Sequence, residues 1–208
     1  MLEVTSSAFF IVISIGMTGG IGAGKSVSAE FLHHLGIPLL DTDSVARELV
    51  RPGETGYLAV YKSFGPSFFL ADGTLDRPKM AALVFADPQA LHRLEAILHP
   101  LIRAAWEAWI HKCRERREPM LCVVIPLLFE RGYRADFPVT IAVSCSVSTQ
   151  LERLRCRGWT DLEIQRRLAA QQAMSKKAEQ SRFVVWNEGT VTTLKDQWIK
   201  ILATLKTD

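Results

Sequence analysis

Apolar segments without polar alternation recur along the chain, separated by segments with helical periodicity. Five of them have the length of buried strands and cover residues 9–15, 37–41, 120–128, 139–145 and 183–187. Continuous apolar runs of this kind are typical of parallel strands that are covered on both faces. Helical spacing follows the first run at 25–35 and closes the chain at 191–205. The alternation predicts an α/β fold, with helices on both sides of a parallel sheet.

Two helical insertions interrupt this alternation. The longer one, residues 44–118, exceeds a simple crossover and predicts a substrate-side subdomain; Asp76 before Pro78 is typical of a helix N-cap within it. The shorter one, 151–182, predicts a helix-turn-helix whose second arm begins at the capping box Thr160-x-x-Glu163. The remaining segments, 9–43, 119–150 and 183–208, are expected to form one core.

The first apolar run also has to be considered as a membrane segment. AFFIVISIGM has about half the length of a spanning helix. It follows Glu3 rather than positive charge, and no A-x-A cleavage pattern comes after it, so a buried strand is the better interpretation. The four cysteines lack C-x-x-C spacing, which predicts reduced thiols and a cytoplasmic protein. A net charge of +3 gives no argument for a nucleic-acid partner.

The stretch GMTGGIGAGKSV, residues 16–27, carries the pattern Gly19-x-x-x-x-Gly24-Lys25-Ser26 between the first strand and a helix. The backbone N–H groups of such a loop and the N-terminus of the following helix form a site for phosphates. Lys25 is expected to reach the β- and γ-phosphates of a nucleotide, and the Ser26 hydroxyl to ligate Mg²⁺. The loop residues predicted to contact the nucleotide are Gly20, Gly22, Ala23, Gly24, Lys25, Ser26 and Val27.

The loop alone leaves a kinase, a nucleotide switch and a motor open. The N-K-x-D and D-x-x-G tetrapeptides of GTPase switches are absent. ATP-driven motors usually have an apolar strand that ends in acidic residues, which orient Mg²⁺ and water, and here the nearest such residue is Glu130, displaced beyond the third strand. The hairpin at 151–182 is rich in arginine, as a lid needs to be if it closes over phosphates and excludes water. This favours a kinase, and a switch that needs a protein partner stays as the alternative from another class.

The second strand ends in Asp41-Thr42-Asp43. Ligands of parallel α/β sheets bind at the carboxyl ends of the strands, so these carboxylates are expected at the same crevice as the phosphate loop. A carboxylate there can orient an acceptor hydroxyl and take its proton. Position alone equally allows Asp43 to be the N-cap of the following helix.

Six blocks of the sequence, in this order, closely resemble the dephospho-CoA kinase family. They are IGMTGGIGAGKS, GIPLLDTDSVARELVRPG, DGTLDR, LHPLIR, VVIPLLFE and the hairpin ending RRLAAQ, and they extend from about 11 to 187. The resemblance implies ATP-dependent phosphorylation of the ribose 3′-hydroxyl of dephospho-CoA, the final step of coenzyme A synthesis. ATP, Mg²⁺ and dephospho-CoA are then the small-molecule partners, without nucleic acid, membrane or an obligate protein partner. A nucleoside or nucleotide kinase of the same architecture is the second choice.

The resemblance also implies an architecture and roles for individual residues. The fold is expected to be a P-loop core with strand order 2-3-1-4-5, a helical acceptor domain at 44–118 and a helical lid at 151–182. Asp43 is implied as the base or orienting carboxylate, and Arg157 as the lid arginine that meets the transferring phosphate. The acceptor side is implied to include Asp41, Asp43, Arg47, His99, Arg103, Leu127 and Leu128, although the two leucines also suit the core. Asn187 and Gly189 match the loop beside adenine, and Arg167 and Gln171 belong to the lid pattern.

Overall fold

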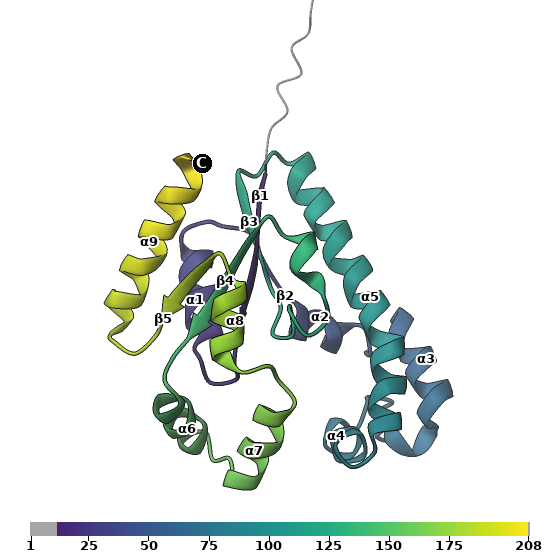
Figure 1. Cartoon of the computed structure of the whole chain (residues 1–208). Helices are drawn as coiled ribbons and strands as arrows, with labels where there is room; N and C mark the ends of the chain where they lie inside the picture. Colours follow the sequence, from purple (N-terminus) through teal and green to yellow (C-terminus); the bar gives the residue numbers. More distant parts are fainter. Residues whose placement is uncertain (1–11, 208) are drawn as a thin grey trace, which may run out of the picture. The chain divides into compact units, whose positions relative to one another are not determined.

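The computed structural model describes residues 12–207, and residues 9–11 of the predicted first strand lie outside that range (Figure 1). The strands are β1 (Ile13–Gly19), β2 (Leu39–Asp41), β3 (Met120–Val124), β4 (Val139–Ser144) and β5 (Phe183–Trp186). The α-helices are α1 (Lys25–His34), α2 (Thr42–Glu48), α3 (Thr55–Phe64), α4 (Arg77–Ala86), α5 (Pro88–Glu115), α6 (Val147–Cys156), α7 (Asp161–Ala169), α8 (Met174–Gln180) and α9 (Val191–Thr207). Two short 3₁₀ turns, η1 (Pro66–Phe68) and η2 (Tyr133–Asp136), complete the list.

The five strands form one parallel sheet in the order β2-β3-β1-β4-β5, which confirms the predicted order. β1 lies in the centre, where Ile15 pairs with Cys122 of β3 and with Val139 of β4. β3 ends at Val124, earlier than the apolar pattern predicts. Pro126 has no N–H for the ladder, and its carbonyl accepts a hydrogen bond from the Thr18 hydroxyl instead.

By its internal contacts the chain divides into two compact units. The first unit contains the described residues up to Leu39 and those from Lys112 onward, which include the hairpin α6–α7. The other is Leu40–His111. The division into a core, a helical acceptor domain at 44–118 and a lid at 151–182 stays a prediction.

The core of the first unit forms where the sheet meets α1 and α9 (Figure 1). Ile15 and Met17 of β1 pack there with Leu32 of α1 and the fully buried Trp198 of α9. Alternate residues of β1 face the other side of the sheet, which α8 contacts through β1 and β4. A side chain at Gly16 would meet Leu128 and Phe137, so glycine is required for this close packing.

The second unit is helical and has its own small core around Val50, Val60 and Met80. Tyr57 and Tyr61 stack beside it, and Phe69 packs edge to face against Tyr57 and at a tilt against Tyr61, with ring centroids 5.0–6.1 Å apart. Asp76 caps α4 by accepting the Lys79 N–H, as the sequence predicts. No helix within residues 12–207 is long and apolar enough to cross a membrane.

Candidate active site

The phosphate loop connects β1 to α1 with the backbone that its glycines allow. Gly24 immediately precedes α1 at φ 104°, in the left-handed region, and Gly22 has φ 77°. The Lys25 ammonium donates to the carbonyls of Gly19 (2.8 Å) and Gly20 (3.0 Å), while Ser26 is exposed in the first turn of the ten-residue helix. The loop therefore presents a cation, a hydroxyl and a helix N-terminus together, which is the equipment of a phosphate site.

Asn187, just beyond β5, holds this loop from the side. Its side-chain amide donates to the Ala23 carbonyl at 2.8 Å, and its backbone N–H donates to Ser144 at 2.7 Å. A Cβ at Gly24 would collide with the Asn187 amide, so glycine is needed there for space as well as for φ. The predicted contact between Asn187 and adenine stays a prediction; its support of the loop is a function that the sequence did not reveal.

Glu188 attaches the same segment to the start of α6. Its carboxylate accepts the Ser146 N–H and, at 2.7 Å, the Thr149 hydroxyl. These hydrogen bonds, the one from Ser146 first, lower the pKa of Glu188 below its usual value. The carboxylate thus stays ionised, and the loops after β4 and β5 are held side by side.

The lid arginines divide between the loop and the surface. Arg153 donates through Nη2 to the Asn187 carbonyl at 2.9 Å, and its buried Nη1 has no hydrogen-bond partner among the described residues. Arg157, the predicted phosphate contact, is exposed at the C-cap of α6. Arg155 pairs with Asp161, and Arg167 lies 4.3 Å from the centroid of the Trp159 ring. Arg153 Nη1 also lies beside the phosphate loop, since a Cβ at Gly24 would be 3.9 Å from it.

Two glutamines hold the tip of the phosphate loop, and sequence reasoning missed this arrangement. The Gln171 side-chain carbonyl accepts the Ile21 N–H at 3.1 Å, and the Gln150 amide donates to the Ile21 carbonyl at 2.6 Å. Gln150 lies in α6, and Gln171 follows α7, so the contacts come from both ends of the hairpin. The RRLAAQ block pointed to Gln171 as part of the lid, whereas Gln150 had no signal in the sequence.

A buried ion pair lies behind the loop. The Lys177 ammonium of α8 donates to the Pro126 carbonyl at 2.5 Å and pairs with Glu130 at 2.7 Å; its side chain is 1% exposed. Burial lowers the pKa of Lys177 below its usual value, and the pairing with Glu130 offsets only part of that effect. Glu130 also accepts the Gln172 N–H at 2.8 Å. Glu130 therefore anchors the end of the lid, a role that differs from the acidic end of a motor strand.

The residues predicted to bind the acceptor lie on different elements of the chain, with Asp41, Asp43 and Arg47 at α2. Asp41 is the N-cap of α2, because its carboxylate accepts the Asp43 N–H at 3.0 Å. The alternative that Asp43 caps this helix is therefore wrong, since Asp43 lies within its first turn, four residues before Arg47. His99 and Arg103 share α5, where Arg103 pairs with Glu107 at 2.7 Å.

Leu127 and Leu128 belong to the first unit. Leu128 is fully buried against the sheet and has no surface to offer a ligand, so we assign it to the core. Leu127 is half-buried.

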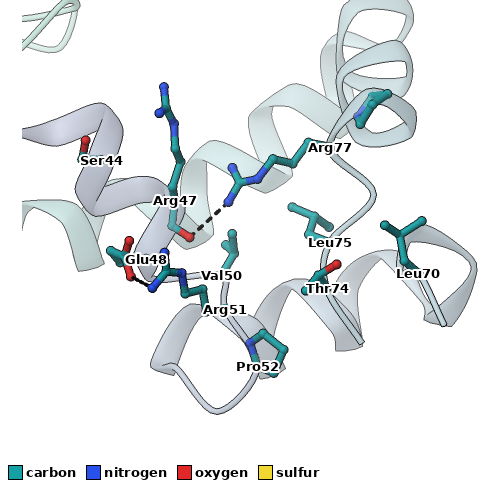
Figure 2. A pocket seen from close by; sticks show the side chains of 11 residues that line it. Ser44, Arg47, Glu48, Val50, Arg51, Pro52, Leu70, Thr74, Leu75 and Arg77 are labelled. Atoms are coloured by element: carbon teal, nitrogen blue, oxygen red, sulfur yellow. Dashed lines mark hydrogen bonds and ion pairs between the residues drawn. The ribbon is translucent and has the colours of Figure 1, made fainter. Parts of the chain in front are cut away.

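The second unit contains a cavity of about 580 Å³ between α2 and the start of α4 (Figure 2). Arg77, at the start of α4, extends toward α2 and donates to the Arg47 carbonyl at 3.1 Å. Arg51 pairs with Glu48 at 2.6 Å. Of these arginines, only Arg47 was predicted from the sequence to bind the acceptor. Arg77 closes the DGTLDR block, so the block itself was the signal for it.

A parallel sheet in this order, a glycine loop carrying Lys25 and Ser26, and an arginine-bearing hairpin over the loop define a P-loop kinase of the small-molecule class. A family model described as dephospho-CoA kinase matches residues 13–193. The chain belongs to the dephospho-CoA kinase family, the kinases that use ATP to phosphorylate dephospho-CoA in coenzyme A biosynthesis.

Individual relatives agree with this membership. The chain is 42% identical to a dephospho-CoA kinase of Bdellovibrio bacteriovorus over 83% of its own length and 86% of that protein. It is 41% identical to a dephospho-CoA kinase of Thiobacillus denitrificans, over 89% and 92% of the two chains. The crystal structure of TT1252 from Thermus thermophilus is similar at a TM-score of 0.80, with 32% identity over 93% of this chain and 97% of that one.

Proposed function

We propose that this kinase transfers the γ-phosphoryl group of ATP to the ribose 3′-hydroxyl of dephospho-CoA, with Asp43 as the carboxylate that orients the hydroxyl and accepts its proton. The observation that carries the assignment is the N-cap of α2. Asp41 fulfils that structural role, so Asp43 is not needed as the cap. Membership of the family supports the substrates, and the position of Asp43 in the DTD block supports its role.

The phosphate loop supplies positioning and charge in this mechanism. Lys25 leaves the carbonyls of Gly19 and Gly20 to contact the β- and γ-phosphates, and the N–H groups at the start of α1 bind the remaining oxygens. A lid arginine, Arg153 or Arg157, neutralises the charge on the moving phosphoryl group. Closure of the α6–α7 hairpin excludes water, which limits hydrolysis of ATP in the absence of the acceptor.

Mg²⁺ belongs to the proposal through Ser26. The described residues contain no group of three His, Cys, Asp or Glu side chains that would hold a metal by themselves. Mg²⁺ in nucleotide sites is held largely by phosphate oxygens and water, with one or two protein ligands, and the exposed Ser26 hydroxyl suits this arrangement. The metal would neutralise charge between the β- and γ-phosphates. A cytoplasmic location and the absence of a protein or nucleic-acid partner are likewise proposals, from the cysteine pattern and the charge.

The experiment that tests the proposal measures ADP release with dephospho-CoA, adenosine, AMP or shikimate as the acceptor. We expect strong stimulation by dephospho-CoA, with a new 3′-phosphate in the product by ³¹P NMR. Asp43→Asn should retain ATP binding and lose about 10²- to 10⁴-fold in kcat. Glu54→Gln, which changes an exposed carboxylate of the same unit, is the control and should leave kcat unchanged. Full turnover by the Asp43 variant would remove Asp43 from the mechanism, and stimulation by no acceptor would favour the nucleotide switch.

A further inference from the structure

We infer that the arginine-lined cavity of the second unit binds the diphosphate of dephospho-CoA, with Arg77 and Arg51 as specificity residues beside Arg47. The inference rests on the proposed function, because it takes the acceptor and the position of its ribose from there. Arg51 and Arg77 lie outside the DTD block and the phosphate loop, so the inference gives a role in substrate binding to two residues that the proposed function does not use. It also assigns this cavity to one part of the substrate, the charged link between adenosine and the pantetheine arm.

The charge of the cavity matches that of a diphosphate ester. Arg47, Arg51 and Arg77 line it together with a single carboxylate, Glu48, which leaves an excess of two positive charges. A diphosphate with two ester bonds carries two negative charges at neutral pH. The Ser44 and Thr74 hydroxyls lie in the same lining, where they donate to the carboxylates of Asp41 (3.4 Å) and Asp72 (2.6 Å), so the arginines supply the donors for phosphate oxygens. Guanidinium groups suit this ligand because their planar N–H pairs bind phosphate oxygens in a bidentate way.

A hydrogen bond to the backbone orders the Arg77 guanidinium before any ligand binds. Its Nη2 donates to the Arg47 carbonyl at 3.1 Å, which fixes the guanidinium at the wall of the cavity (Figure 2). An arginine has five N–H donors, so one bond to a carbonyl leaves others for an anion. Because the side chain is already ordered, less conformational entropy is lost when the ligand binds.

The position of Arg47 relative to Asp43 matches the shape of the acceptor. The two residues are four apart on α2, so they share a face and are separated by about 6 Å along the axis. In an adenosine 5′-diphosphate, one ribose separates the 3′-hydroxyl from the first phosphate by a similar length. A ribose whose 3′-hydroxyl lies at Asp43 therefore places its 5′-diphosphate beside Arg47, whose carbonyl Arg77 contacts, at the cavity that Arg51 also lines. The exposed Leu70 and the half-buried Leu75 provide an apolar surface for the uncharged arm beyond it.

The test compares acceptors with and without the diphosphate in matched variants. Arg77→Met and Arg51→Met should each raise the KM for dephospho-CoA by about 10- to 100-fold with little change in kcat, because a charged hydrogen bond is lost on binding. The kcat/KM for adenosine, which has no phosphate, should stay within about twofold of that of the native protein. Arg93→Met removes an exposed arginine of the same unit outside the cavity and should change neither acceptor.

Calorimetric titration of dephospho-CoA without ATP is the second measurement, with circular dichroism as the check that each variant folds. Weaker binding to the Arg51 variant, which loses no backbone contact, supports the inference even if Arg77→Met perturbs α4. Equal losses with dephospho-CoA and adenosine, or unchanged binding in both variants, would overturn it. If the native protein bound dephospho-CoA but did not phosphorylate it, the proposed function would fail, while the titrations would still decide on the cavity.

Discussion

Replacement of Lys177 by methionine tests whether the buried ion pair behind the phosphate loop is a major source of stability. Methionine has similar length and no charge, so it removes the ammonium from Pro126 and Glu130 while it fills most of the space. Glu130 is then left in the interior with only the Gln172 N–H as a partner for its Oε1, and its Oε2 is already buried without a partner among the described residues. A single charge in that position is costly because water replaces the lost partner only in part.

The size of the effect follows from the exposure of the two side chains. Loss of one member of a buried pair costs about 3–5 kcal/mol of unfolding free energy. Lys177 is 1% exposed, but Glu130 is 18% exposed and is partly reached by water, so the lower end of that range applies. For a chain of this size, 3 kcal/mol lowers Tm by about 6–12 °C.

Urea denaturation followed by tryptophan fluorescence measures the difference directly. Lys176→Met, the exposed neighbour on α8, is the matched control and should change the unfolding free energy by less than about 0.5 kcal/mol. The double variant Lys177→Met, Glu130→Gln should recover part of the loss, because no charge remains unpaired. Equal behaviour of the Lys176 and Lys177 variants, or a double variant no more stable than the single one, would refute the argument.

Two further predictions concern the loop and the sheet. Gly24→Ala should destabilise the protein by about 1–3 kcal/mol and weaken ATP binding, since φ is 104° and the new Cβ meets Asn187. Thermal melts measure the loss of stability. Gly36→Ala is the control, because Gly36 has φ 76° but open space around it, so that only the backbone strain should lower its stability. Burial raises the pKa of Cys122 from 9.0 to about 12, so between those values the folded protein retains a proton that the unfolded chain has lost. The unfolding free energy should therefore fall as pH rises above 9, with up to about 1.4 kcal/mol per pH unit from this thiol. Cys122→Ala should show a shallower decline in urea titrations at pH 8, 9 and 10, where the raised pKa values of Cys113 and Cys145 still contribute. Equal slopes for the two proteins would contradict the assignment.

Apolar periodicity was sufficient for the sheet, because each strand carries a continuous run of apolar residues and the three central strands, β1, β3 and β4, are buried on both faces. The ends of the strands were less predictable. The apolar run of 120–128 continues beyond β3, and only the bonds of the Pro126 carbonyl with Thr18 and Lys177 show why the ladder stops. The capping box Thr160–Glu163 was correctly predicted, since both of its hydrogen bonds are local in the sequence.

The site was predictable where chemistry follows from a local motif. Lys25 and Ser26 belong to one short pattern, and the structure places them at the start of a helix as expected. The contacts that were missed join residues far apart in the chain. Lys177 lies in the polar run MSKKAEQ and reads as a surface lysine, yet it is the buried one of two adjacent lysines. Gln150 likewise bonds to a loop 129 residues earlier, and no local pattern marks such a pairing.

The two glutamine contacts at the tip of the phosphate loop also have a consequence for how this sequence can change in evolution. Both bonds end on the backbone of Ile21, one on its N–H and one on its carbonyl. Every amino acid except proline offers the same two groups, so position 21 can exchange its side chain without loss of either bond. Gln150 and Gln171 have no such freedom, because one uses its amide and the other its side-chain carbonyl. Substitutions should therefore accumulate at the loop residue that is held and remain rare at the two residues that hold it.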